Sequence, residues 1–140
     1  MNYNLNIGKG LDYLNFDYSV NEIIHLLGKP KKITDDGSTL CMDYKNRGLF
    51  VSFEKEDEKW TDMDIQTDKI FYKNINWFDI EKSELLKAIK KIYQEKQITY
   101  KFYKSEVELL NEEQYDFYEI GVSLFFKINN LTNVYVSKPI

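Results

Sequence analysis

Short stretches in which apolar and polar residues alternate dominate this chain. They cover residues 3–7, 40–44, 49–53, 61–65, 98–102, 115–118, 121–128 and 131–136. A period of two places every second side chain on one face of a β-strand. Turn-forming residues, such as the run Asp35-Asp36-Gly37, separate several of these stretches. The pattern predicts antiparallel strands with one buried face.

Two other segments have the spacing of helices. In the first, Ser19 and Glu22 form a capping-box pattern ahead of an apolar stripe, and Gly28 and Pro30 end it. This predicts a helix over residues 20–27. In the second, apolar residues recur at helical spacing and predict a helix over about 82–95. Residues 105–113 then interrupt the alternation and are expected to form an insertion.

The order of these patterns repeats. Phe16-Asp17 precedes the first predicted helix and Phe78-Asp79 the second, and alternating stretches follow each time. Such a repeat indicates one supersecondary unit used twice. We expect an α+β fold of two tandem αββββ repeats, with helices packed on one face of an antiparallel sheet. The repeats would cover residues 1–68 and 69–140 and form one compact domain.

The segment from Asn15 to Pro30 resembles the start of domains with the β-lactamase-inhibitor-protein fold, in which a helix and a four-stranded meander occur in tandem. Small outer-membrane assembly lipoproteins contain the same unit once. The secreted inhibitor has disulfides and the lipoproteins an N-terminal lipidated cysteine. Here the single cysteine, Cys41, lies inside a predicted strand. The resemblance therefore implies a cytoplasmic relative, and by analogy a bacterial immunity protein that neutralises a toxin.

Composition narrows the possible partners. The 140 residues have a net charge of −4, which argues against non-specific nucleic-acid binding because phosphate neutralisation needs a basic surface. One cysteine excludes an intrachain disulfide and favours a reducing compartment. The sequence has no apolar run of signal-peptide or membrane-span length, so a cytoplasmic location without a membrane partner is expected. Abundant Asn, Lys and Ile hint at an AT-rich bacterial genome.

Catalytic chemistry has little support in the sequence. His25 is the only histidine, and neither a nucleophile nor a metal-ligand spacing accompanies it. We therefore expect no catalytic residue, no metal and no cofactor. Asp62 and Asp64 share one strand face and leave open glycosidase-like acid–base chemistry, although a solvated face is the favoured interpretation.

The outward face of the predicted sheet offers a better candidate site. Strand parity places aromatic and acidic side chains there together. They are Phe50, Glu54, Trp60, Asp62, Asp64, Asp116, Tyr118, Phe125 and Tyr135. Exposed aromatic residues are typical interface anchors. Residues 54–64 also contain six acidic residues and two lysines, which suits a basic partner such as a toxin domain.

Three functions follow as hypotheses. The first is a non-enzymatic protein-binding module, most concretely an immunity or inhibitor protein that occludes a toxin with its sheet face. The second is an enzyme that uses carboxylates in a cleft between the repeats. The third is a structural or assembly module. Cover by the insertion, by the other repeat or by a homodimer partner is the alternative explanation for the aromatic face.

Overall fold

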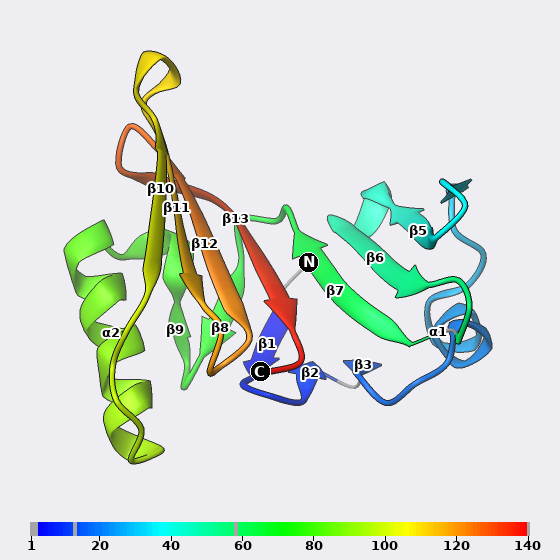
Figure 1. Cartoon of the computed structure of the whole chain (residues 1–140), viewed down its shortest axis with the longest axis horizontal. Helices are drawn as coiled ribbons and strands as arrows, with labels where there is room; N and C mark the ends of the chain where they lie inside the picture. Colours follow the sequence, from blue (N-terminus) through cyan, green and yellow to red (C-terminus); the bar gives the residue numbers. More distant parts are fainter. Residues whose placement is uncertain (1–2, 13, 58, 140) are drawn as a thin grey trace.

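The computed structural model describes residues 3–12, 14–57 and 59–139 and contains two β-sheets and two α-helices in those ranges (Figure 1). Each α-helix begins and ends where the sequence predicts: α1 covers Val20–Leu27 and α2 covers Lys82–Glu95. Both halves of the Ser19–Glu22 capping box are present at α1. Three short 3-10 helices complete the helical content, at η1 (Lys45–Arg47), η2 (Trp77–Asp79) and η3 (Glu108–Leu110).

The large sheet has eight strands among the described residues, in the order β10-β11-β12-β13-β7-β6-β5-β4, and all neighbours are antiparallel. Its strands are β4 (Lys32–Asp35), β5 (Thr39–Tyr44), β6 (Leu49–Glu54), β7 (Trp60–Ile65), β10 (Tyr103–Val107), β11 (Glu112–Phe117), β12 (Val122–Lys127) and β13 (Asn130–Ser137). The middle of the sheet is the pair β7–β13, which joins strands that are far apart in the sequence.

The small sheet has five short strands in the order β3-β2-β1-β8-β9. Its strands are β1 (Tyr3–Asn6), β2 (Gly10–Leu11), β3 (Leu14–Asn15), β8 (Ile70–Tyr72) and β9 (Ile75–Asn76). β1 and β8 are parallel and the other pairs are antiparallel. At Gly10, where φ is +144°, a Cβ atom would lie 1.9 Å from the carbonyl oxygen of Leu14, so the approach of β2 to β3 requires glycine.

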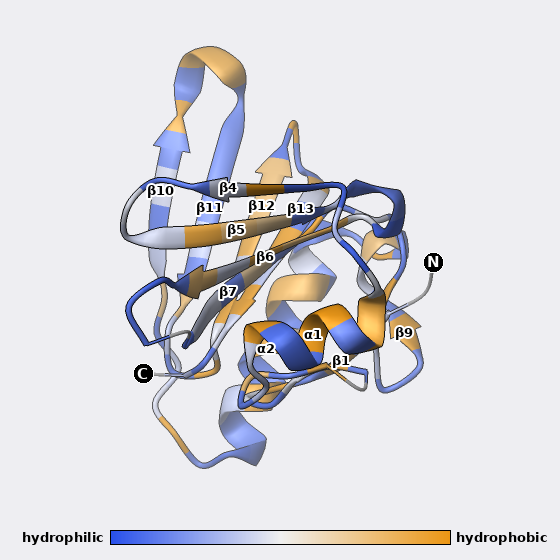
Figure 2. Cartoon of the chain, turned by 90° about the vertical axis from the view of Figure 1, so that its right-hand side faces the viewer, coloured by the Kyte–Doolittle hydropathy of each residue, from blue (hydrophilic) through white to orange (hydrophobic). Residues whose placement is uncertain are grey.

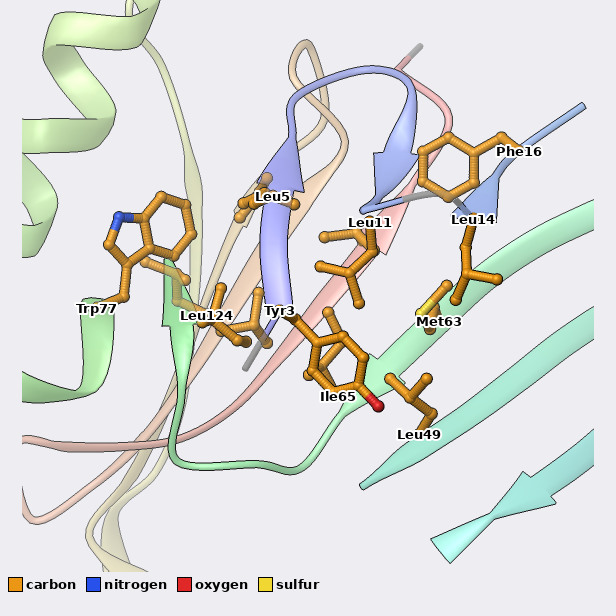
Figure 3. Close-up of a cluster of buried hydrophobic side chains, with 14 of the residues drawn as sticks. Tyr3, Leu5, Leu11, Leu14, Phe16, Leu49, Met63, Ile65, Trp77 and Leu124 are labelled. Carbon is orange, nitrogen blue, oxygen red and sulfur yellow. The ribbon is translucent and has the colours of Figure 1, made fainter. Parts of the chain in front are cut away.

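The hydrophobic core lies between the inner face of the large sheet and the layer formed by the small sheet and the helices. Figure 3 shows Leu11 and Leu14 of the small sheet directed toward Met63 on β7. Ile23 of α1 and Ile89 of α2 are fully buried in the same core. In Figure 2, α1 lies below strands β4 to β7. The inward-facing side chains of the large sheet are therefore buried away from solvent, as the alternation of apolar and polar residues predicts.

The predicted fold was wrong. The described residues are mostly β, with 44% in strands and 23% in helices, and they do not form two αββββ repeats with helices packed on a sheet. The prediction lacked the small sheet, which β1, β2, β3, β8 and β9 form. The alternation over residues 3–7 did indicate β1, but the remaining strands of two or three residues are too short for a clear period-two pattern, and the pairing of β1 with β8 has no local signal.

A second correction concerns the edge of the large sheet. Residues 98–102 were expected to be a strand, but they are not assigned to one. The edge strand is β10, which begins at Tyr103 and overlaps the first residues of the segment 105–113 that was expected to be an insertion. β10 alternates Lys104 and Glu106 with less polar residues, all of them exposed, so its composition has no apolar stripe to mark it.

Candidate functional site

The candidate site is the open face, which we define as the side of the large sheet that faces away from the core. Eight of the nine residues predicted to bind a partner lie on it or beside it. They are Phe50, Glu54, Asp62, Asp64, Asp116, Tyr118, Phe125 and Tyr135. Their strand neighbours, such as Val51 and Leu124, are buried in the core. The alternation thus sends these eight side chains to the opposite side.

Strand register aligns one side chain from each strand into a row across this face. The row is Tyr103, Asp116, Ser123, Tyr135, Asp64, Phe50, Asp43 and Lys32, in the spatial order of the strands. Neighbouring strands are about 4.8 Å apart, so Asp64 and Asp116 are about 14 Å apart along the row. Two carboxylates and the tyrosine ring between them therefore share one line across the middle of the sheet.

Asp64 is held in place by two neutral side chains. Its Oδ1 accepts a hydrogen bond from Asn133 Nδ2 at 3.0 Å, and its Oδ2 accepts one from Gln66 Nε2 at 2.6 Å. Only 9% of the residue is exposed. A buried carboxylate needs such donors because burial without them is unfavourable. The bond to Asn133 also ties β7 to β13 on the open face.

Asp116 is held in a similar way. Its Oδ1 accepts hydrogen bonds from Ser123 Oγ at 2.6 Å and Gln114 Nε2 at 2.9 Å, and Tyr118 Oη lies 3.5 Å from Oδ2. Asp116 is 7% exposed, and its charge raises the pKa of the exposed Tyr118 hydroxyl. The site therefore contains a second fixed carboxylate, and again its hydrogen-bond donors are uncharged.

An aromatic pair lies between the two carboxylates. The ring centroids of Phe125 and Tyr135 are 4.7 Å apart with an interplanar angle of 44°. Both residues are half-buried. Burial, followed by the nearby charges of Asp64 and Asp62, raises the pKa of Tyr135 to about 12. Tyr135 is thus neutral at physiological pH and presents a hydroxyl beside an apolar ring surface.

Asp62 belongs to the next row of the open face, two residues from Asp64 on β7. Burial, followed by the negative charge of Asp64, raises the pKa of the Asp62 carboxyl above its ordinary value. The ion pairs between described side chains do not include Asp62, Asp64 or Asp116. The middle of the open face therefore has negative charge that no lysine or arginine in the described ranges pairs with.

Trp60 is the one predicted site residue that the structure places elsewhere. It is 3% exposed and its ring contacts Phe16 and Phe53 in the core, at centroid distances of 5.1 and 5.8 Å. The reason is a register shift in which Ser52 pairs with Asp62 but Phe53 pairs with Trp60. The extra residue, Thr61, forms a β-bulge that reverses the alternation. Strand parity counted through this bulge gave the wrong face.

Two further predicted residues lie on β6. Phe50 is half-buried in the central row, next to Asp64, and Glu54 is exposed at the end of the strand. Glu58, which belongs to the acidic run noted above, lies outside the described residues. Strand parity places Ser123 and Asn133 on the outward face, but the role of Gln66, Gln114, Ser123 and Asn133 as hydrogen-bond donors was not predicted. For Ser123 a signal was available, because it lies directly across from Asp116 once β11 and β12 are paired.

An apolar cavity of about 210 Å³ lies between the β8–β9 hairpin and α2, away from the open face. Tyr72, Trp77, Ile80 and Ile92 are among its lining residues. An ion pair between Lys73 Nζ and Glu95 Oε2, 2.8 Å long, joins the hairpin to the helix beside it. Sequence reasoning missed this cavity because it depends on strands that were not predicted.

The ranges that the structure covers contain no group of three or more His, Cys, Asp or Glu side chains able to hold a metal ion. His25 is exposed on α1 and Cys41 is half-buried on β5. No α-helix in these ranges has the length and apolar character needed to cross a membrane.

Comparison with known proteins gives one structural likeness. No protein-family model matches the chain, and neither does any curated protein. The fold is similar to the crystal structure of a DUF4309 family protein (YjgB) from Bacillus subtilis subsp. subtilis str. 168, with a TM-score of 0.50 and 11% sequence identity. The match covers 94% of this chain and 88% of that one. At this identity the likeness concerns the fold alone.

Proposed function

We propose that this chain is a non-enzymatic protein-binding module whose open face binds a basic surface of another protein. The observation that carries the proposal is the arrangement of Asp62, Asp64 and Asp116 around the Phe125–Tyr135 pair, with neutral donors instead of cations. The arrangement combines negative charge with apolar rings on one rigid sheet. A partner with lysine or arginine side chains around an apolar patch would complement it.

The aromatic pair would supply most of the affinity. Binding energy in protein interfaces concentrates in a few central residues, often aromatic, that become fully desolvated in the complex. Phe125 and Tyr135 lie near the middle of the large sheet and are each half-buried before any partner arrives. Little conformational entropy would then be lost when a partner covers them, because strand pairing already restricts both side chains.

The carboxylates would supply orientation and association rate. Fields of opposite sign steer two proteins together and suppress wrong partners, and this effect weakens as salt is added. Hydrogen bonds hold Asp64 and Asp116 in fixed positions about 14 Å apart on the row. A partner would therefore need two cationic side chains at a matching separation, which makes the site selective.

A toxin-neutralising immunity protein is the concrete form of this function that the sequence predicts. The negative charge of the open face supports this function because it would attract a basic toxin domain. The second candidate is a carboxylate enzyme, and one observation favours it: the raised pKa of Asp62 beside Asp64. A general acid has this property, although a binding site with clustered carboxylates has it too.

Binding experiments with matched variants test the proposal. Wild-type protein, Phe125→Ala and the double variant Asp64→Asn/Asp116→Asn are each immobilised and exposed to a bacterial lysate, and the captured proteins are compared. The controls are Leu26→Ala, which truncates an exposed apolar side chain, and Glu84→Gln, which neutralises one exposed carboxylate, both on the helices. A partner of the open face is retained by wild type and both controls and lost with the site variants.

The kinetics of the recovered partner then separate the two contributions. We expect Phe125→Ala to weaken binding by about 2 kcal/mol or more, mainly through faster dissociation. We expect the double Asn variant mainly to slow association at low salt and to approach wild type at high salt. Equal binding by wild type and both site variants, with the fold intact by circular dichroism, would reject the proposal.

A further inference from the structure

β10 forms a free edge of the large sheet. β10 is the last strand of the sheet and pairs on one side only, with β11. All five of its residues are exposed. Figure 1 shows that the turn joining β10 to β11 projects beyond the other strands. A free edge presents unpaired backbone N–H and C=O groups, which can pair with a strand from another chain.

Exposed apolar side chains are concentrated on the same edge. Phe102, Tyr103, Val107, Leu109 and Leu110 are 42%, 58%, 50%, 97% and 53% exposed, respectively. Free strand edges are commonly protected by charge, proline or bulges. β10 has the charged Lys104 and Glu106 in its middle, but large exposed apolar groups lie at both of its ends and just beyond them. Such an accumulation in a short exposed segment is typical of an interaction surface.

The sequence of β10 is complementary to itself when two copies run antiparallel. If Ser105 lies opposite Ser105 of a second copy, then Lys104 lies opposite Glu106 and Tyr103 opposite Val107. Each opposing pair has its side chains on the same face of the sheet, because the paired positions differ by an even number. Opposite charges and apolar pairs in directly opposed positions each stabilise neighbouring strands.

We propose that two copies of this chain bind each other through their β10 strands, in this antiparallel register with a twofold axis at Ser105. The two large sheets would then be continuous across the junction. Beyond the strand, the apolar Leu109 and Leu110 of each copy would approach Phe102 of the other. Because the twofold axis is perpendicular to the sheet, both open faces would lie on the same side of the dimer.

The opposite edge of the sheet is less suited to this pairing. β4 has four residues, and Ile33 is its one large exposed apolar side chain, at 51% exposure. Asp35 of β4 forms an intrachain ion pair with Lys55 at 2.7 Å, and Lys104 of β10 forms ones with Glu106 and Glu113 at 2.6 and 2.9 Å. The two edges therefore differ in their exposed apolar side chains and not in the engagement of their charges. A dimer through β10 leaves both β4 edges at its ends. The β4 edge therefore provides a matched control.

Site-directed crosslinking tests the register. Directly opposed residues of antiparallel strands have Cα atoms about 4.5–5.5 Å apart, which is within the range that a disulfide spans. In a Cys41→Ser background, we expect Ser105→Cys to form a covalent dimer on mild oxidation, and Thr34→Cys on β4 to remain monomeric. A crosslink through Thr34→Cys alone, or through neither cysteine, would overturn the proposal.

Mass measurements of the whole chain test the dimer itself. By light scattering, we expect the average mass of the wild-type protein to rise with concentration from 16.8 kDa, the mass of one chain, toward twice that value. Glu106→Lys places lysines opposite each other at two symmetric positions and should raise the dimer dissociation constant about tenfold or more. The swap Lys104→Glu/Glu106→Lys restores opposite charges across the junction and should recover much of the loss. A monomer at all concentrations would also overturn the proposal, whereas the open face would be unaffected.

Discussion

The two faces of the large sheet come from alternate residues of the same strands, yet they differ in how their side chains are satisfied. The inner face has side chains such as Val51 and Leu124 that are fully buried in the hydrophobic core. The open face has buried carboxylates, Asp64 and Asp116, that need hydrogen-bond donors from adjacent strands. Apolar packing is non-directional, whereas hydrogen bonds fix position. The open face is therefore the better place for a specific recognition site.

The largest effect is expected from a substitution of Trp60, which tests whether this side chain lies in the core or on the open face. Because its ring is in the core, we expect Trp60→Ala to lower the free energy of unfolding by about 3–5 kcal/mol through cavity formation. The measurement is urea denaturation followed by circular dichroism. Phe125→Ala, on the open face, should cost clearly less stability. A stable Trp60→Ala variant would mean that the bulge at Thr61 is wrong and that Trp60 belongs to the open face.

The layer that covers the inner face should be nearly as sensitive. Ile89 of α2 is fully buried and Leu27 of α1 is 6% exposed. We expect Ile89→Ala and Leu27→Ala each to lower the free energy of unfolding by about 2–5 kcal/mol. Leu26→Ala is the control, since its side chain is 39% exposed. If all three variants lose the same small amount, the helices do not contribute to the core as described.

Removing a carboxylate from the open face should have an intermediate effect. Asp116→Ala leaves Ser123 and Gln114 without their acceptor, and a buried donor that loses its partner costs about 1–3 kcal/mol. Asp116→Asn keeps an acceptor oxygen and should cost less. Thermal unfolding of the two variants measures the difference. Equal losses would indicate that these hydrogen bonds contribute little to the stability of the face.

The smallest effect that we expect depends on pH. Folding raises the pKa of Asp62, so the folded chain holds this proton more tightly than the unfolded chain does. Its contribution therefore favours folding at acid pH and is lost as the pH rises through the folded pKa. Asp62→Asn should be more stable than wild type at pH 7, and the difference should vanish below the ordinary aspartate pKa. A difference that does not change with pH would contradict this.

The sequence predicted local features well where one pattern decides the structure. The capping box and Gly28 delimit α1, and the second apolar stripe gives both ends of α2. Alternation also placed Asp64, Asp116 and Tyr135 on one face. Each of these results depends on residues within about four positions of one another, so the chemistry of a short segment is sufficient.

Features that depend on long-range pairing were not predicted. β1 pairs with β8 through residues more than 60 positions apart, and no local signal marks such a contact. The bulge at Thr61 has no glycine or proline to mark it, and it sent Trp60 to the opposite face. The donors to Asp64 come from Gln66 and from Asn133 on another strand. The candidate site was therefore predicted as a set of side chains, but the network that fixes them was not.

The pairing of β7 with β13 also has a kinetic consequence. During synthesis, Ile65 leaves the ribosome long before Val134, its partner in the sheet, so β7 must wait for β13 with one edge unpaired. Loop closure over such a separation slows folding, and an unpaired strand edge can bind other chains in the meantime. The strand edge that ends up in the centre of the native sheet is therefore unpaired during synthesis. Slow expression at low chain concentration should favour correct folding.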